Sequence, residues 1–354
     1  MIKAMSTFWS PLVRELDPYV PGEQPKGQNL VKLNTNENPF PPSPRVRQAI
    51  SDNEILALRL YPDPDSSRLK KTIAEYYQLA SDQVFVGNGS DEVLAHSFVA
   101  FFKQPQPILF PDVSYSFYPV YANLFGIETK TPALNKDFTI DISAFDQPNG
   151  GVILPNPNAP TGIYLSLDDI RSLVEANTES VVIIDEAYID FGGESAVCLI
   201  NEYDNLLIVQ TLSKSRSLAG LRVGYAMGQV HLIEALDRVK NSFNSYPLDR
   251  LAEVAAIAAF EDEAYFVECC NKIMATREWT IEQLTKLGFS ILPSKTNFLF
   301  AKPSHKGAQS VFNELRAKGI IVRFFKKPGL SDYLRISIGT RDEMTMLIDA
   351  LTES

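Results

Sequence analysis

The segment Ser180-Val-Val-Ile-Ile-Asp-Glu-Ala-Tyr188 decides the fold class of this 354-residue chain. Four β-branched apolar residues in a row predict a strand that is buried on both faces, and two acidic residues end it abruptly. Such strands form parallel sheets that helices cover on both sides. Ligands bind beyond the carboxyl ends of these strands, so we expect Asp185 and Tyr188 at a ligand site.

Apolar runs of the same kind recur at residues 83–87, 107–110, 151–155 and 205–210. Helical patterns lie between several of them, for example at 92–102 and 166–177. This alternation predicts an α/β fold in which helices sandwich a mostly parallel sheet. After residue 248 short strands and helices alternate around a smaller α+β C-terminal domain.

The chain divides into three parts. Residues 1–30 contain several prolines, which predict an extended arm that packs on its own domain or on a second subunit. We expect a large domain over 31–247 and a small C-terminal domain over 248–354. The small domain should begin with one long helix that runs from about Leu248 through Asp262 into Leu287.

Composition excludes several classes of function. The formal charge of −10 argues against nucleic acid or an anionic membrane as partner. Three cysteines cannot form a disulfide framework, and three histidines far apart in the sequence predict no metal site. No apolar run approaches the roughly 20 residues of a membrane span. We therefore expect a cytoplasmic protein that acts on small molecules.

The strand at 205–210 leads into Thr211-Leu-Ser-Lys-Ser-Arg-Ser-Leu-Ala-Gly-Leu-Arg222, which brings together one lysine, several hydroxyls and a second cation. A buried lysine such as Lys214 can form a Schiff base with an aldehyde, while hydroxyls and Arg222 suit a phosphate monoester. Pyridoxal phosphate carries both groups. A basic surface loop is the alternative interpretation, but the small and apolar residues at 218–224 disfavour it.

Two further strand ends suit the same cofactor. The turn Gly89-Ser90-Asp91 joins a strand to a helix, where exposed N–H groups favour an anion such as phosphate. An aromatic residue beyond the next strand can stack on a planar ring. Tyr115 is our candidate, and Phe117 and Tyr118 compete with it.

The remaining strand ends carry residues that could contact the pyridine ring of this cofactor. Asp185, paired to a pyridinium nitrogen, would keep the ring protonated and able to accept electrons. Tyr188 can donate to the ring oxygen, and an Asn-rich turn near Asn158 lies beside them in the predicted sheet. Once a substrate amine displaces Lys214, this lysine can serve as the base that moves the Cα proton.

In order and spacing, these motifs resemble the fold-type I, class II pyridoxal-phosphate aminotransferases, and among them the histidinol-phosphate aminotransferase family, over nearly the whole chain. The resemblance rests on Leu16–Gly22, Leu33–Pro39, Tyr61–Pro64, Gly87–Glu92, Pro157–Gly162, Asp185–Tyr188, Thr211–Lys214, Leu218–Arg222 and Leu334–Gly339.

The resemblance implies a ping-pong transfer of an amino group between L-histidinol phosphate and 2-oxoglutarate, as in histidine biosynthesis. Catalytic roles would fall to Lys214, Asp185 and Tyr188. The implied cofactor site consists of Lys214, Gly89, Ser90, Asp91, Tyr115, Asn158, Asp185, Tyr188, Thr211, Ser213, Arg222 and Tyr61. The implied substrate site consists of Arg335, Arg323, Tyr19 and Asn38. Tyr61 would reach the cofactor phosphate of a neighbouring subunit, which implies a homodimer.

One position departs from the family pattern. The family usually has Asn immediately before Pro-Thr-Gly, where its amide meets the ring oxygen, but this chain has Ala159 there. Either a neighbouring Asn compensates for the missing donor, or the electronics of the bound cofactor change. We expect activity to survive because Tyr188 remains.

Other activities on the same fold stay open at this point. An aromatic-amino-acid aminotransferase or a threonine-phosphate decarboxylase would use the same cofactor residues. From a different class, the chain could be a pyridoxal-phosphate-binding regulator without turnover. The arm and Arg323 favour a phosphorylated substrate, and the joint presence of Lys214, Asp185, Arg222 and Arg335 favours an enzyme.

Overall fold

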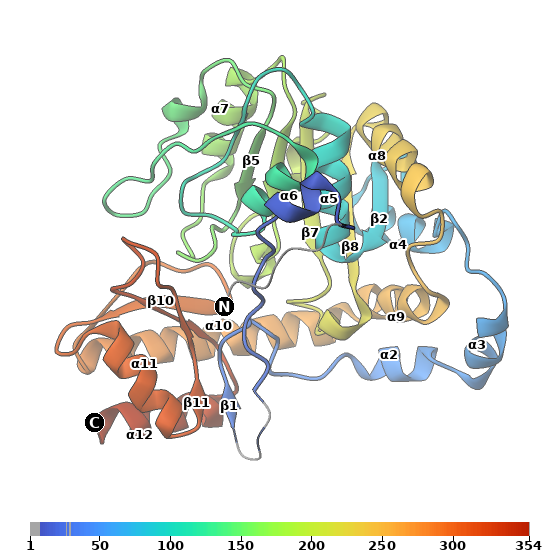
Figure 1. Cartoon of the computed structure of the whole chain (residues 1–354). Helices are drawn as coiled ribbons and strands as arrows, with labels where there is room; N and C mark the ends of the chain where they lie inside the picture. The colour runs from blue at the N-terminus through green and yellow to red at the C-terminus, as the bar shows by residue number, and fades with distance from the viewer. Residues whose placement is uncertain (1–7, 26, 28–29, 354) are drawn as a thin grey trace.

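A computed structural model describes residues 8–25, 27 and 30–353 of the chain. Its central feature is a seven-stranded sheet in the order β2-β8-β7-β6-β5-β3-β4 (Figure 1). All strands run parallel except β8, which is antiparallel to both of its neighbours. The strands are β2 (Val84–Asn88), β3 (Ile108–Leu109), β4 (Thr129–Lys130), β5 (Val152–Pro155), β6 (Val182–Asp185), β7 (Leu206–Thr211) and β8 (Val223–Gly228). The expected mostly parallel sheet is confirmed.

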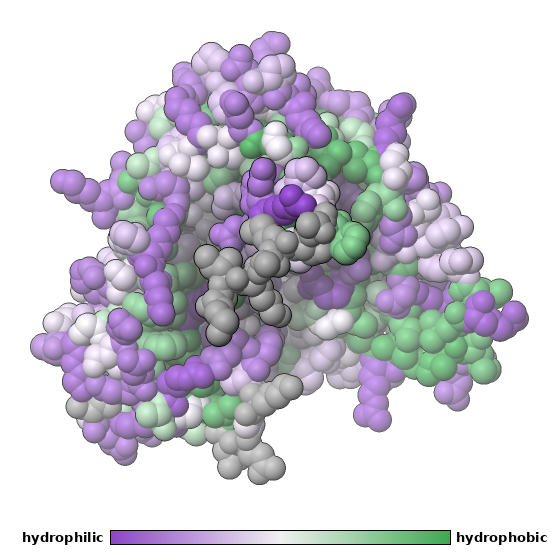
Figure 2. Space-filling model, viewed as in Figure 1, coloured by the Kyte–Doolittle hydropathy of each residue, from purple (hydrophilic) through white to green (hydrophobic). Residues whose placement is uncertain are grey.

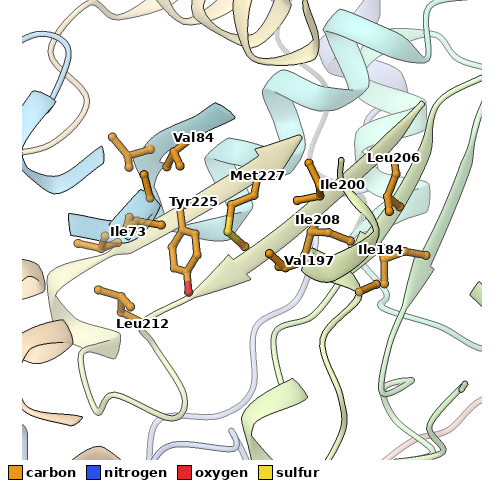
Figure 3. Close-up of a cluster of buried hydrophobic side chains, with 14 of the residues drawn as sticks. Ile73, Val84, Ile184, Val197, Ile200, Leu206, Ile208, Leu212, Tyr225 and Met227 are labelled. Carbon is orange, nitrogen blue, oxygen red and sulfur yellow. The ribbon is translucent and has the colours of Figure 1, made fainter. Parts of the chain in front are cut away.

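Helices cover both faces of this sheet, as the apolar strands predicted. One face packs against α4 (Ser67–Tyr77), α7 (Leu167–Ala176) and α9 (Arg250–Glu261), and Figure 3 shows part of that cluster, in which Ile184, Ile208 and Met227 project from adjacent strands. The other face packs against α5 (Gly89–Phe101), α6 (Tyr118–Phe125) and α8 (Val230–Phe243). Because successive strand residues face opposite sides, Ile183 and Ile184 enter different clusters.

The C-terminal part forms a second, smaller sheet in the antiparallel order β12-β13-β10-β9. Its strands are β9 (Phe289–Ile291), β10 (Phe298–Pro303), β12 (Arg323–Phe324) and β13 (Leu334–Ser337). Helices α10 (Glu263–Lys286), α11 (Ala308–Ala317) and α12 (Arg341–Thr352) contribute to its separate apolar core. A further parallel pair joins β1 (Val31–Lys32) to β11 (Ile320–Ile321).

The N-terminal residues that the structure describes run over their own chain. The short helix α1 (Pro11–Glu15) lies over α5 and α6 in Figure 1, and the following arm descends from it towards β1. The Tyr19 ring packs 4.6 Å from the ring of Phe117, and Glu23 pairs with both terminal nitrogens of Arg316 at 2.6 and 2.7 Å. Along the chain, α2 (Pro44–Ala49), α3 (Asp52–Leu56) and the 3-10 helix η1 (Ala57–Arg59) follow β1 and precede α4. Other 3-10 helices are η2 (Ser81–Gln83), η3 (Ile142–Phe145), η4 (Ile189–Phe191), η5 (Ala196–Leu199) and η6 (Ala219–Leu221).

The structure differs from the sequence-based expectation at three places. Residues 11–15 are helical rather than extended, because Ser10 caps a turn that starts with Pro11. The single helix expected over 248–287 is two helices, since Asp262 leaves helical geometry between α9 and α10. The sequence analysis did not identify β8, whose glycines weaken the strand signal.

Contacts cross both of the domain boundaries expected from the sequence. β1, at the start of the expected large domain, pairs with β11 of the small one. α9, placed in the small domain, packs in the core beneath the large sheet. The boundaries at 30/31 and 247/248 therefore remain a proposal. Among the described residues no helix is long and apolar enough to cross a membrane.

Candidate functional site

The predicted site residues gather at the carboxyl edge of the large sheet. In the register of the parallel strands, Asp185 at the end of β6 lies beside Pro155 of β5 and Val209 of β7. The segments that leave these strands carry Asn158, Tyr188 and Lys214, and β2 leads directly into α5. One edge of the sheet thus receives residues that are widely separated in the sequence.

Asp185 is a buried carboxylate at this edge. It continues the row of Ile183, so it points to the face covered by α6, where the Tyr118 hydroxyl donates to its Oδ2 at 2.8 Å. Burial raises the pKa of Asp185 to about 6, against the hydrogen bonds from Tyr118 and from the Ala187 backbone N–H, which lower it. Glu186 points the other way, towards Ser195 and Gln210. Only the first of the two acidic residues therefore faces the site.

Small residues make room for an anion cradle at the start of α5. Gly89 has φ +80, and a Cβ on it would come within 2.4 Å of Arg222 Nη2. A Cβ on Gly224 would lie 2.1 Å from the backbone N of Ser90, so β8 approaches the first turn of α5 only because residue 224 is glycine. Arg222 therefore lies directly against the N-terminus of α5.

The cationic side chain in this cradle is held by two neighbours. Arg222 Nη2 donates to Asp91 Oδ2 at 2.8 Å, and Nη1 donates to Ser213 Oγ at 3.4 Å. Thr211 accepts from the backbone N–H of Ser213 at 3.1 Å, which shapes the loop before Lys214. Hydroxyls, a guanidinium and a helix N-terminus thus converge, and this is the donor set that a phosphate monoester requires.

The three aromatic candidates beyond β3 have different surroundings. Tyr118 is fully buried against Asp185, and Phe117 packs on Tyr19 and Tyr121. Tyr115 remains half-buried, and its hydroxyl donates to Asp91 Oδ1 at 2.9 Å. Burial, with the nearby Asp91 charge, raises the pKa of Tyr115 well above its usual value. Tyr115 is thus joined to the cradle, while Tyr118 serves Asp185.

Lys214 is half-buried, and its Nζ donates to the Thr35 carbonyl at 3.2 Å. The same amine lies 5.7 Å from the centre of the Tyr188 ring. The amide of Asn38 donates to the carbonyls of Lys214 and Ser215, both at 3.0 Å, and Asn38 Oδ1 accepts from the Phe40 backbone N–H. The contacts of Asn38 are thus made to the lysine loop rather than directed towards an open substrate space.

The Ala159 position is buried and contributes only a methyl group. Beside it, the Asn158 amide nitrogen donates to the Val113 carbonyl and the Thr161 hydroxyl, both at 3.1 Å. Asn158 Oδ1 is buried and has no hydrogen-bond partner, so an acceptor stands ready for a ligand donor. The Tyr188 oxygen accepts from the amide of Asn36 at 3.0 Å.

Two arginines lie side by side on the small sheet. Arg323 of β12 and Arg335 of β13 are paired in the strand register. Arg335 Nη2 donates to the Asn34 carbonyl at 2.9 Å, while its buried Nε has no partner. Burial lowers the pKa of Arg335 from its usual high value, and the nearby Arg323 charge lowers it further. A bound anion would accept a hydrogen bond from the unpaired Arg335 Nε and would offset the repulsion between the Arg335 and Arg323 guanidinium groups.

Tyr61 lies at the open side of the cradle. Its side chain is 80% exposed and stacks on Tyr246 at 4.8 Å. Both tyrosines line a surface pocket of about 660 Å³ that also reaches Asn88 and Arg222. A ligand anion at Arg222 could therefore be approached from this pocket.

The residues present fit the cofactor predicted from the sequence. The cradle offers donors for its phosphate, Asp185 offers a carboxylate for its ring nitrogen, and the Lys214 amine suits its aldehyde. The unpaired Asn158 Oδ1 belongs to the segment after β5, the strand next to β6 with its Asp185 in the sheet order. Nothing in the contacts of the described residues blocks this assignment.

Sequence analysis missed three contributors to the site. The Thr35 carbonyl holds the lysine, the Tyr118 hydroxyl holds Asp185, and the Asn36 amide holds Tyr188. The sequence analysis considered Tyr118 only as a stacking residue and gave Asn36 no role of its own. Only the Asn-rich motif at 34–38 could have pointed to Asn36, since no local pattern records partners that are 152 residues apart.

Comparison with known proteins agrees with this geometry. A family model described as aminotransferase class I and II matches residues 28–351. A histidinol-phosphate aminotransferase from Acinetobacter baumannii (strain SDF) is 59% identical, and the match covers 99% of this chain and 98% of that protein. Histidinol-phosphate aminotransferase 2 from Dechloromonas aromatica (strain RCB) is also 59% identical, with 99% of both chains covered. A solved histidinol-phosphate aminotransferase from Sinorhizobium meliloti, in complex with pyridoxal-5'-phosphate, superposes with a TM-score of 0.89 at 25% identity, over 99% of this chain and 98% of that one.

Proposed function

The chain belongs to the class I and II aminotransferase family, and we propose that it transfers the amino group of L-histidinol phosphate to 2-oxoglutarate in histidine biosynthesis. The products are imidazole-acetol phosphate and L-glutamate, and pyridoxal 5'-phosphate is the cofactor. The observation that carries this proposal is structural. The consecutive carbonyls of Asn34 and Thr35 hold the Arg335 guanidinium and the Lys214 amine, which brings an anion-binding cation and a nucleophile to one short segment.

The residues that would hold the cofactor are those already described. Ser90, Ser213 and Arg222 would bind its phosphate, and Asp185 would keep its ring nitrogen protonated. When bound, pyridoxal phosphate supplies an aldehyde that condenses with amines and a ring that takes up the electrons of a breaking Cα–H bond. Tyr118 keeps Asp185 oriented, because its hydroxyl donates to the carboxylate oxygen Oδ2.

Lys214 Nζ would be both the point of attachment for the cofactor and the group that carries the proton. Its free amine would be released when the substrate amine takes its place, and it could then accept the substrate Cα proton. The Thr35 carbonyl and the Tyr188 ring keep this amine at the site. The Asn38 contacts hold the lysine backbone while the side chain moves.

Arg335 and Arg323 would bind the anionic end of each substrate. The phosphate of histidinol phosphate and a carboxylate of 2-oxoglutarate or glutamate both suit a guanidinium fork. Tyr19 lies on Phe117 beside the Tyr115 ring, so the arm would help to exclude water from this side. One cation pair would thus serve two unlike substrates.

We also propose that the protein is a cytoplasmic homodimer. Figure 2 shows a hydrophobic patch where Figure 1 places α3, at the lower right of the view. Its exposed apolar residues are Ile55, Leu56, Leu58 and Leu60, and they lie next to Tyr61 in the sequence. A patch of this kind supports an interface between two copies, which would bring Tyr61 to the neighbouring cofactor phosphate. The three cysteines are all free, which suits a reducing compartment.

Trapping of the cofactor tests the proposed function. Borohydride treatment of cofactor-saturated protein, followed by peptide mass analysis, should find the cofactor mass on Lys214. The Lys214→Ala variant should lose this label and at least about 10³-fold in amino-transfer rate. An unmodified Lys214 in saturated wild-type protein would contradict the proposal.

A donor screen tests the substrate. The visible absorption of the bound cofactor should fall on addition of histidinol phosphate and return with 2-oxoglutarate. Aromatic amino acids and threonine phosphate should act more slowly. A faster response to either would favour an aromatic-amino-acid aminotransferase or a phosphothreonine-specific enzyme, and no response to any donor would favour a regulatory binding protein.

A further inference from the structure

The hydroxyl of Tyr188 has an unusual neighbour for a group that must donate a proton. Asn36 Nδ2 donates to the Tyr188 oxygen at 3.0 Å. Asn36 is 1% exposed, so no water competes for its amide. A phenol oxygen that accepts one hydrogen bond keeps its own proton free to donate elsewhere.

The orientation of the Asn36 amide follows from its other contacts. The backbone N–H of Asn36 donates to Ser337 Oγ at 2.9 Å, so the single Ser337 proton is directed to Asn36 Oδ1, also at 2.9 Å. The amide of Asn297 donates to the Asn36 carbonyl at 2.9 Å and holds the backbone. Because Oδ1 is committed to Ser337, the NH₂ side must face Tyr188.

The hydrogen bond from Asn36 to Tyr188 matters because the side chain at position 159, where the family usually has a donor to the cofactor ring oxygen, has no polar group. Ala159 can offer nothing to the cofactor ring oxygen, and the Asn158 amide hydrogens go to Val113 and Thr161. Among the residues named in the site, Tyr188 is therefore left as the donor to that oxygen. We propose that Asn36 is a positioning residue which, through Tyr188, directs the phenol proton towards the cofactor ring oxygen; this inference rests on the proposed function.

A purely structural role for Asn36 makes a different prediction. Asn36 has φ 56, a left-handed conformation that Gly, Asn and Asp adopt most readily. Asn could therefore occupy position 36 only because it tolerates this backbone conformation. Replacement by glycine separates the two roles, since it preserves this backbone conformation and removes the amide.

The test follows the pH midpoint of the visible absorption of the bound cofactor. A donor to the ring oxygen stabilises that oxygen as an anion, so it favours loss of the proton shared with the Lys214 nitrogen. The Asn36→Gly variant should therefore raise the midpoint by about 0.5 to 1 pH unit, a roughly three- to tenfold change in the equilibrium constant. Tyr188→Phe should raise it at least as far.

Two comparisons keep the inference falsifiable. In the Tyr188→Phe background, Asn36→Gly should cause no further shift, because it acts through the missing hydroxyl. Asn177→Ala removes a comparably buried amide that donates to the Leu173 carbonyl at the C-terminal end of α7, and it should leave the midpoint unchanged. If Asn36→Gly does not fold, Asn36→Asp retains the size and should raise the midpoint, since its carboxylate would draw the phenol proton away.

An unshifted midpoint in a folded Asn36→Gly protein would overturn the inference and leave the proposed function intact. A shift that adds fully to that of Tyr188→Phe would overturn it as well. A wild-type protein without any visible cofactor band would instead contradict the proposed function, and the inference with it.

Discussion

The buried negative charge of Asp185 lowers the folding stability of the cofactor-free protein. Its pKa is raised from 3.8 to about 6, so the folded protein binds a proton here more readily than the unfolded chain does. Protonated Asp185 contributes to the free energy of unfolding; this contribution is fully present below pH 3.8 and is lost as the pH rises through about 6. At neutral pH the ionised carboxylate therefore destabilises the fold until a cationic partner is bound.

Asp185→Asn should consequently stabilise the cofactor-free protein while it abolishes amino transfer. Asparagine can still accept from Tyr118 and carries no buried charge. We expect the free energy of unfolding to rise by about 2 to 3 kcal/mol at pH 8, and by less as the pH falls towards 4. Denaturant unfolding of both proteins across this pH range measures the effect.

Asp146 offers a matched control for this prediction, because it is an exposed aspartate. Asp146→Asn should change the free energy of unfolding by less than about 0.5 kcal/mol. Equal stability of wild-type and Asp185→Asn proteins at pH 8 would show that the carboxylate does not carry the expected burial cost.

At the scale of elements, the segment between β7 and β8 is the part of the fold that presents Lys214. Arg216 anchors it on one side, because its guanidinium lies 4.0 Å from the Phe266 ring centre and 4.3 Å from that of Phe260, and donates to the Ala259 carbonyl at 2.7 Å. Asn38 anchors it on the other side through the Lys214 and Ser215 carbonyls. Both anchors come from outside the sheet.

Asn38→Ala should therefore weaken cofactor binding rather than substrate binding. Loss of two hydrogen bonds to the lysine loop should raise the Kd for pyridoxal phosphate by roughly 5- to 30-fold. At saturating cofactor, the KM for both substrates should change little. Equilibrium titration with the cofactor and steady-state kinetics measure the two effects separately.

Asn205 provides the control for this element. Its amide also donates to backbone carbonyls, those of Val174, Asn177 and Ser180, but at the amino end of β7. Asn205→Ala should lower stability without a change in cofactor affinity. A raised KM with unchanged cofactor affinity in Asn38→Ala would instead support the substrate-binding role expected from the sequence.

At the scale of the molecule, the apolar patch at 55–60 predicts the oligomeric state. Leu56 is 72% exposed, and a charge placed there should oppose burial against a second copy. Leu56→Glu should shift the solution mass from dimer towards monomer and weaken cofactor binding, because Tyr61 would no longer reach a neighbouring site. Light scattering after gel filtration measures the mass.

Met346 is a suitable control, since it is 51% exposed on α12, far from α3 in Figure 1. Met346→Glu should leave the mass unchanged. A monomeric wild-type protein that binds the cofactor fully would show that the site is complete within one chain, as the shared pocket of Tyr61 and Arg222 would then allow.

The sequence by itself determined the sheet and its functional edge. Apolar runs such as 180–184 specify buried strands through composition alone, and parallel strands necessarily bring their carboxyl ends to one side. The placement of Lys214 and Asp185 at this edge followed from that rule, whereas their chemical roles stay proposals.

Only the tertiary structure decided which neighbours control these groups. The pairs Asn36–Tyr188, Tyr118–Asp185 and Thr35–Lys214 are separated by 152, 67 and 179 residues, and the arm was found on its own chain. The close approach of β8 to the first turn of α5 likewise depends on the absence of a side chain at Gly224. Local patterns report how a residue is buried, but hydrogen-bond partners are chosen by how distant segments pack, and that information exists only in the folded chain.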